Sequence, residues 1–262
     1  TITGTNFGPD VADNAVSATY QNTALSGLAG SLYLATDCAV TVAHTQMVCT
    51  SVADGVGHGL RWTVTVGDQA SSASTATTSY NAPTITSLGG LSTFKTDGTD
   101  EELVTINGTD FGPKDGTGNP VIAVYQNSGL SSTYASGEFT ARECVVSVAH
   151  TQITCKPAAS GGAGKDQAWK VTVGDQQSTA SSDTTSYIAP AITGLSGLSS
   201  FRTDGADTAL VTITGTNFGV GNEDNLTIVT YQNAALNSSY ASGEFTGVGC
   251  VVTVNHAQIT CK

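Results

Sequence analysis

The sequence predicts an all-β fold built as tandem β-sandwiches, and three observations lead to this prediction. The octad TITGTNFG at residues 1–8 returns in closely similar form at 105–112 and 212–219, and such a long fixed period indicates repeated domains. Short apolar stretches alternate with glycine-rich turns, and no stretch keeps the 3.6-residue period of an amphipathic helix. The six cysteines form three pairs with one common spacing.

Two prolines predict where the repeats begin. Pro83 and Pro190 each precede a short strand-like segment, and proline is tolerated at a strand's first position because no ladder hydrogen bond is lost there. The predicted domains are therefore 1–81, 82–188 and 189–262. Since only a few residues separate them, we expect neighbouring domains to touch and to form a semi-rigid rod.

The octad of the second repeat is predicted to end a strand that begins near residue 103. It follows a segment, residues 90–98, that is rich in turn-forming residues and is predicted to be a bend. Gly108 and Gly112 flank Phe111, which predicts a tight turn that needs positive φ, with the phenyl ring folded back into the core. A binding role for this ring is the alternative.

A β-hairpin is predicted in each repeat between the two cysteines. In the second repeat, β-branched arms flank a turn near His150, so the two ends face each other at a distance that a disulfide can bridge. Disulfides imply an oxidising compartment. The turn histidines, one per hairpin, leave a Cys-His-Cys metal site as the alternative. The predicted pairs are Cys38 with Cys49, Cys144 with Cys155, and Cys250 with Cys261.

The strand after the hairpin is predicted to bury one face. Trp169, Val171 and Val173 alternate with polar residues, which is typical of a half-buried strand, and Trp62 begins the same pattern in the first repeat. A run of serine and threonine at 178–186 follows. It is predicted to be a polar edge strand, with O-linked sugars as the alternative.

Composition and charge argue against several classes of function. Only 11% of residues are charged and the net charge is −12, so nucleic acid, whose backbone is anionic, is not an expected partner. No apolar run is long enough to span a membrane. No nucleophile or phosphate-loop motif occurs, so we expect neither an enzyme nor a cofactor. Carboxylates at Asp97, Asp100, Glu101 and Glu102 leave calcium as a weaker alternative, because their spacing matches no loop template.

Covalent glycans are the expected modification. Asn107, Asn225 and Asn237 each begin an Asn-x-Ser/Thr sequon with no proline in its middle position. Asn225 and Asn237 are the better candidates, because Asn107 lies within the tight octad.

These motifs together resemble the IPT/TIG family. The strand and turn ITGTNFG, the cysteine hairpin VVSVAHTQITC, the strand VTVG and the closing Tyr-x-x-Pro-x-Ile pattern carry the resemblance across the whole chain, three times. The resemblance implies immunoglobulin-like sandwiches with a binding or spacing role and no catalytic residues. Its extracellular branch is the better match, because the transcription-factor branch presents basic loops to DNA.

Alignment of the octads predicts that the first and last domains are incomplete. The first lacks the counterpart of residues 83–104, and the last lacks the counterpart of the chain after Lys156. We expect the chain to be part of a longer repeating protein; completion of the broken domains by strands of a neighbouring subunit is the alternative. The expected function is a structural, extracellular or cell-surface protein that self-associates into a filament, hair or coat. The alternative is the stalk of an adhesin or receptor.

Overall fold

The structure, a computed structural model, describes residues 1–11, 13–22, 32–114, 121–127, 138–202, 205–221, 227–232 and 244–262. Within these residues the regular secondary structure consists of β-strands, with no α-helix, so the predicted all-β class is confirmed. The strands fall into three groups along the chain, called here the first, second and third sandwich.

The first sandwich comprises strands β1 to β8. One sheet has the order β1-β5-β4 and the other the order β3-β2-β6-β7, with β8 also paired to β6. The strands are β1 (Ile2–Thr3), β2 (Val16–Gln21), β3 (Leu32–Leu34), β4 (Thr36–Val42), β5 (Gln46–Thr50), β6 (Leu60–Val66), β7 (Gln69–Ala70) and β8 (Thr77–Thr78).

The second sandwich comprises strands β9 to β18. Its sheets have the orders β14-β15-β11-β9 and β10-β18-β16-β12-β13, with β17 paired to β16. The strands are β9 (Thr84–Gly90), β10 (Thr93–Phe94), β11 (Val104–Thr109), β12 (Ile122–Gln126), β13 (Glu138–Thr140), β14 (Arg142–Val148), β15 (Gln152–Lys156), β16 (Gln167–Val173), β17 (Gln176–Gln177) and β18 (Thr184–Tyr187).

The third sandwich comprises strands β19 to β24. A four-stranded sheet has the order β19-β20-β24-β23, and β21 pairs with β22. The strands are β19 (Ala191–Gly197), β20 (Val211–Thr216), β21 (Thr230–Gln232), β22 (Glu244–Thr246), β23 (Val251–Val254) and β24 (Gln258–Cys261).

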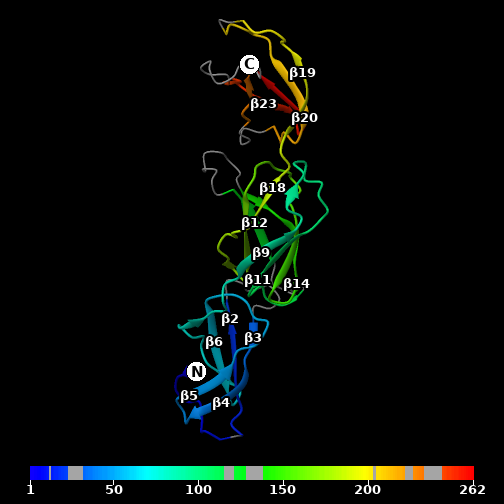
Figure 1. Ribbon diagram of the computed structural model, residues 1–262. Helices are drawn as coiled ribbons and strands as arrows, with labels where there is room; N and C mark the ends of the chain where they lie inside the picture. The colour runs from blue at the N-terminus through cyan, green and yellow to red at the C-terminus, as the bar shows by residue number, and fades with distance from the viewer. Residues whose placement is uncertain are drawn as a thin grey trace.

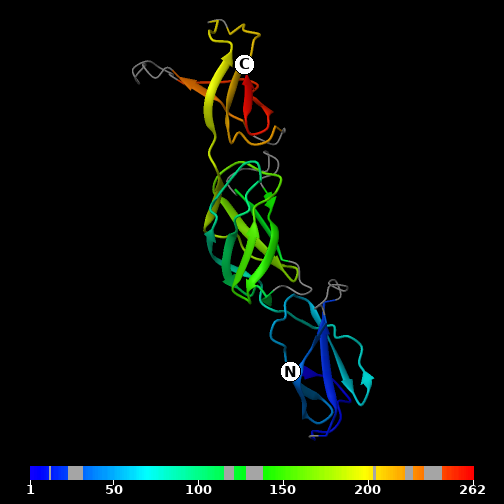
Figure 2. The same cartoon turned by 90° about the vertical axis from the view of Figure 1, so that its right-hand side faces the viewer.

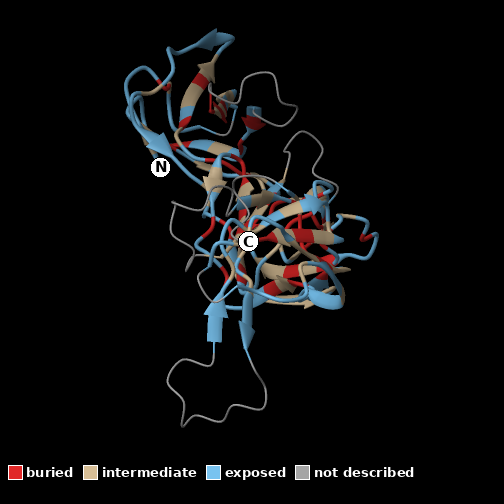
Figure 3. Ribbon diagram, turned by 90° about the horizontal axis from the view of Figure 1, so that it is seen from above, coloured by how far each residue is buried: buried red, intermediate tan, exposed pale blue. Residues whose placement is uncertain are grey.

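The three groups follow one another in a row from the N-terminal to the C-terminal end (Figures 1 and 2). Each has its own cluster of buried apolar side chains, and the second has the largest among the described residues. Buried residues lie between the facing sheets, whereas β21 and β22 are exposed along their whole length (Figure 3). The boundaries 1–81, 82–188 and 189–262 remain predictions about domains.

In the octad turn, the phenylalanine ring is buried in the core as predicted, but only one of the two glycines that flank it has positive φ. Phe111 is 1% exposed and lies in the core of the second sandwich. Gly112 has positive φ as expected, and so does Asp110 between the two glycines. Gly108 is required for close packing instead, because a Cβ there would clash with the Thr84 carbonyl and the Phe111 ring.

The predicted bend at residues 90–98 contains strand β10, which the sequence prediction missed. β10 pairs in parallel with β18, and its Phe94 is fully buried. A two-residue strand cannot show a period, so turn-forming residues dominated the pattern around it.

Serine hydroxyl groups accept hydrogen bonds from backbone N–H groups of strand β16. Val171 N donates to Ser178 Oγ at 3.0 Å, and Trp169 N donates to Ser181 Oγ at 2.8 Å. The backbone N–H groups of both serines donate in return to the carbonyls of the same two residues. Because these two hydroxyls are buried and bonded, the serine-rich run is a strand partner rather than a free surface for O-linked sugars at these positions.

The first and second sandwiches are joined by direct contacts. His150 Nε2 lies 2.8 Å from Asp54 Oδ1, and Gln176 Nε2 donates to the Tyr80 carbonyl at 3.1 Å. Val56, 4% exposed, lies so close to Gly112 that a Cβ on this glycine would be 2.6 Å from Val56 Cγ1. This close packing supports the predicted contact between neighbouring domains.

We expect Gly174→Ala to loosen this junction. The new Cβ would lie 2.6 Å from Gly57 N, so the first sandwich must move by about 1 Å to restore an ordinary contact of about 3.5–4.0 Å. Pulsed electron paramagnetic resonance between spin labels on the two sandwiches should show a shifted and broader distance distribution. Gly67→Ala is the matched control, because Gly67 occupies the same turn with positive φ and has nothing within 4 Å of its Cβ position. Equal distributions in both variants would contradict the expected contact.

Candidate binding groove and predicted site residues

The three predicted cysteine pairs are joined in the structure. The Cα atoms of Cys38 and Cys49 are 4.1 Å apart, and those of the other two pairs are 4.2 Å apart, in each case across the hairpin arms. No cysteine among the described residues is free. Three disulfides place the chain in an oxidising compartment, which means extracellular or periplasmic.

The hairpin histidines lie in turns, as predicted. His44, His150 and His256 all adopt positive φ between 63° and 65°. His150 contacts Asp54 of the first sandwich, and His256 Nδ1 lies 2.9 Å from Thr96 Oγ1 of the second. Two of these histidines therefore lie at the contacts between neighbouring sandwiches. The repeat pattern alone did not indicate this role.

Asn107, the sequon within the octad, belongs to a ladder of polar side chains across one sheet. Its Nδ2 donates to Ser87 Oγ at 3.1 Å, and its Oδ1 accepts from Gln152 Nε2 at 3.2 Å. Ser147 Oγ continues the ladder by donating to Gln152 Oε1 at 2.8 Å. Asn107 is half-buried, so a glycan on Nδ2 would have to fit beside this ladder. Asn225 and Asn237 lie outside the described residues.

The acidic segment before the octad is used in turns and ion pairs. Asp100 Oδ2 accepts from Lys95 N at 2.6 Å, and Glu101 pairs with Arg142 and Lys156 at 3.1 and 2.6 Å. The hydrogen bond from Lys156, followed by that from Arg142, lowers the pKa of Glu101. In the part of the chain that the structure describes, no group of three or more histidine, cysteine or acidic side chains is arranged to hold a metal ion.

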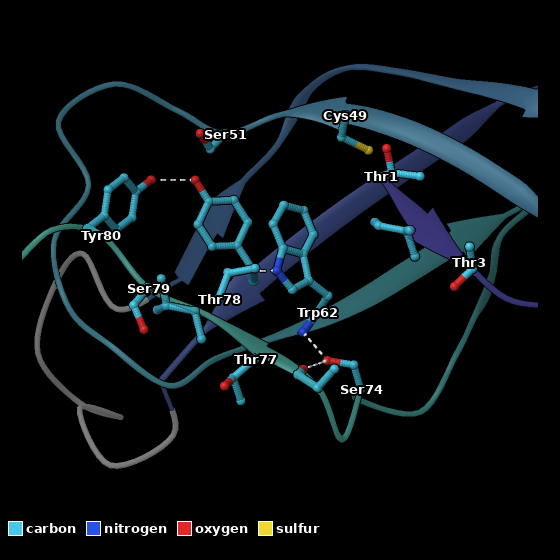
Figure 4. A pocket seen from close by; sticks show the side chains of 14 residues that line it. Thr1, Thr3, Cys49, Ser51, Trp62, Ser74, Thr77, Thr78, Ser79 and Tyr80 are labelled. Carbon is cyan, nitrogen blue, oxygen red and sulfur yellow. Dashed lines mark hydrogen bonds between the residues drawn. The ribbon is translucent and has the colours of Figure 1, made fainter.

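A concave surface lies in the first sandwich. It is a groove of about 440 Å³ between the ends of β1, β5, β6 and the segment around β8. Trp62 is drawn between Thr77–Ser79 on one side and Thr1 and Cys49 on the other (Figure 4). The lining side chains are Thr1, Ile2, Thr3, Tyr20, Cys49, Ser51, Leu60, Trp62, Ser74, Ala76, Thr77, Thr78, Ser79 and Tyr80.

Aromatic rings and hydroxyl groups dominate the chemistry of this groove. Trp62 stacks on Tyr20 with ring centroids 4.3 Å apart, and Trp62 Nε1 donates to Thr78 Oγ1 at 2.9 Å. The hydroxyl groups of Tyr20 and Tyr80 are hydrogen-bonded to each other. Among the described residues that line the groove, none has an acidic, basic or imidazole side chain, so this lining offers apolar contacts and hydrogen bonds.

The corresponding place in the second sandwich is filled by Phe94. This ring lies 5.5 Å from Tyr125, 6.3 Å from Trp169 and 5.5 Å from Tyr187, measured between centroids. These three rings correspond in sequence to Tyr20, Trp62 and Tyr80. The groove of the first sandwich thus lies at the position that Phe94 fills in the second, a relation that sequence reasoning missed because β10 was predicted as a bend.

Two buried tyrosine hydroxyl groups beside Phe94 form a hydrogen bond with each other. Tyr125 and Tyr187 are 2.8 Å apart between hydroxyl oxygens, and Ala158 N donates to Tyr125 at 3.0 Å. Burial is the main cause that raises the pKa of Tyr187, and it also raises the pKa of Tyr125. Ionisation of either hydroxyl is therefore unfavourable in the folded state.

These raised pKa values predict a loss of stability in alkaline solution. A tyrosine whose pKa is raised in the folded protein adds fully to the free energy of unfolding below pH 10, the approximate pKa of tyrosine in the unfolded chain. Above about pH 10 this contribution falls, by up to about 1.4 kcal/mol per pH unit for one tyrosine. Tyr187→Phe should cost about 1 kcal/mol at pH 8, where a hydrogen bond is lost. It should also make the decline between pH 10 and 11 shallower, as measured by urea unfolding. A decline equally steep in the variant would contradict this assignment.

Comparison with known proteins gives little guidance. No protein-family model and no curated protein matches the chain. A crystal structure with xylogluco-oligosaccharide matches with a TM-score of 0.35 and 14% sequence identity, over 84% of this chain and 44% of that one. The chain thus spans less than half of that protein, and a likeness this distant does not bear on function. Within the described residues, no helix has the length and apolar character needed to cross a membrane.

Proposed function

We propose that the chain is a structural protein of the extracellular space or cell surface, which forms or extends a filament, hair or coat by self-association. One observation carries this proposal: both junctions bring a hairpin-turn histidine of one sandwich against the preceding sandwich, His150 at Asp54 and His256 at Thr96. Because the hairpin histidine recurs in each repeat, further repeats can be added to the array through the same type of contact between sandwiches.

The composition and the site residues support this role. The disulfides suit an oxidising exterior. Membership in the extracellular branch of the IPT/TIG family is part of the proposal, on the motifs quoted above. Neither an enzymatic activity nor a cofactor is proposed.

Electron microscopy of native material tests the proposal. We expect filaments or a surface coat in which sandwich-sized bodies repeat along the axis. Short, isolated monomers at high protein concentration would overturn it.

Glycosylation is proposed at Asn225 and Asn237 but not at Asn107. Asn107 is half-buried within the polar ladder between Ser87 and Gln152, so a sugar on its Nδ2 would be crowded by neighbouring side chains. Peptide mapping of native material by mass spectrometry should find Asn107 unmodified. A glycan at Asn107 would contradict this expectation, whatever the occupancy of the other two sequons.

A further inference from the structure

The cysteine hairpin of every repeat is free of charged side chains. Each hairpin runs from the first to the second cysteine of its disulfide, and none of the three contains an aspartate, glutamate, lysine or arginine. The three segments are 38–49, 144–155 and 250–261. An otherwise acidic chain, with a net charge of −12, thus keeps one uncharged segment in each repeat.

Valine side chains project outward from these hairpins. Val146 on β14 is buried in the core, so its neighbour Val145, which points to the opposite side of the strand, faces outward and is 48% exposed. Val148, next to the turn, is 51% exposed. The other two hairpins expose valines at the same places, namely Val42, Val251 and Val254. Single exposed valines are ordinary, but their recurrence on charge-free hairpins indicates a contact surface.

The polar side chains on this outer face are bonded to one another. Ser147 Oγ donates to Gln152 Oε1 at 2.8 Å, and Gln152 Nε2 donates to Asn107 Oδ1 at 3.2 Å. The bond to the glutamine recurs in the other two hairpins, between Thr41 and Gln46 at 3.1 Å and between Thr253 and Gln258 at 3.0 Å. Because these polar groups already have partners within the face, a protein that covers it pays less desolvation than it would over unpaired groups.

The face of the hairpin is better suited to a partner than the edge of its sheet. Strand β14 is the outermost strand of the sheet β14-β15-β11-β9 and lies along the margin of the second sandwich (Figure 1). Its pairing with β15 shifts register between Arg142 and Val145, and again between Val146 and Val148. Such bulges twist an edge strand and disfavour regular backbone pairing with a further strand. We therefore expect contact through side chains.

Charge favours a second copy of this chain as the partner. Two acidic copies repel each other over most of their surface, so they can approach closely only where neither carries unpaired charge. In the second sandwich the charged residues at the end of the hairpin away from its turn form ion pairs among themselves, and these residues are Glu101, Arg142, Glu143 and Lys156. At the turn, His150 faces Asp54 of the first sandwich. A cationic partner would find no carboxylate within the hairpin itself.

The size of the face predicts a weak contact that gains strength by repetition. A stable interface takes about 20–30 residues from each partner, whereas the hairpin of the second sandwich spans only the 11 positions from Cys144 to Cys155. A row of sandwiches presents one such face per repeat. Several weak contacts between two rows then act together, because each contact raises the effective concentration for the next.

We propose that the charge-free outer faces of the cysteine hairpins pack against hairpin faces of a second copy of this chain. This inference rests on the proposed self-association and names the surface that performs it. The exposed valines of the two copies meet at the centre of each contact, and the bonded serine, threonine and glutamine side chains surround them. Identical faces can form a self-complementary contact about a two-fold axis.

Sedimentation equilibrium of the 262-residue chain tests this contact at concentrations up to about 1 mM, where weak association becomes measurable. We expect the apparent mass of the unchanged chain to rise with concentration. The triple variant Val42→Glu, Val148→Glu and Val254→Glu places a like charge on both sides of each contact, so it should associate at least about ten-fold more weakly. A constant monomer mass for the unchanged chain would overturn the proposal.

A matched control separates the hairpin face from a general effect of charge. Leu32→Glu, Leu34→Glu and Ile122→Glu add the same three charges at exposed positions outside the hairpins, and this variant should associate nearly as well as the unchanged chain. Equal association of the two glutamate variants would overturn the hairpin contact. If the hairpin variant loses its near-ultraviolet circular dichroism, threonine at the same three positions keeps the branched shape and should still weaken association several-fold.

The result is distinguishable from failure of the proposed function. Filaments in native material together with equal association of the two glutamate variants would leave the proposed function standing and show that the hairpin face is the wrong surface. Only monomers in native material, and no association of the unchanged chain, would overturn both.

Discussion

Replacing Phe94 with alanine is expected to lower the free energy of unfolding of the second sandwich by about 3–5 kcal/mol. The ring is fully buried and contacts three aromatic rings, which belong to the neighbouring strands β12, β16 and β18 of one sheet. It also anchors β10, which is only two residues long and has little else to hold it beside β18. Its removal leaves a cavity that the stacked pair of Tyr125 and Trp169 cannot close without moving.

Tryptophan fluorescence can report this change for one sandwich at a time. The chain has two tryptophans, so Trp62→Phe leaves Trp169 as the reporter of the second sandwich during urea unfolding. Phe201→Ala in the same background is the matched control, since this exposed ring occupies the same sequence position in the third sandwich. It should leave the Trp169 transition unchanged. Similar losses from both variants would mean that Phe94 is not the anchor that its contacts indicate.

Periodic parts of the sequence predicted the structure well. Trp169, Val171 and Val173 are all buried on one side of β16, because alternation in a long strand directly records which face meets the core. The hairpin and its disulfides followed from symmetry about the turn, which fixes the residues that face each other. Phe111 was predicted as a core residue because a large ring between two turn glycines has few other places to go.

The rest depended on contacts between residues far apart in the chain. Phe94 was hidden among turn formers, and its burial follows from rings contributed by β12, β16 and β18. The junction role of His150 depends on Asp54 in another sandwich. The serine-rich run was predicted as a polar edge, yet Ser178 and Ser181 are buried because their hydroxyls replace strand carbonyls. Composition cannot distinguish a solvated hydroxyl from one that completes a sheet.

The second large effect is expected at the third disulfide. Replacing Cys250 and Cys261 with serine should unfold the third sandwich while the first two remain folded. Its cluster has four buried residues among those described, and Cys261 is one of them, whereas the second sandwich has fourteen. A disulfide that closes a loop of this length contributes about 3 kcal/mol by restricting the unfolded chain. A core so small has little other apolar burial to offset that loss, because stability is a small difference between large terms.

Hydrogen exchange measured by mass spectrometry resolves the effect along the chain. Peptides from β20 and β24 should lose protection in the double serine variant, while those from β11 and β15 should keep it. The matched control replaces Cys144 and Cys155, which removes the same covalent constraint from the larger core and should lower stability without unfolding at room temperature. If the third sandwich keeps its protection without its disulfide, its exposed apolar residues must already be covered by another surface. Loss of that protection on dilution would then point to a second copy as the cover, whereas protection independent of concentration would place the cover within the chain.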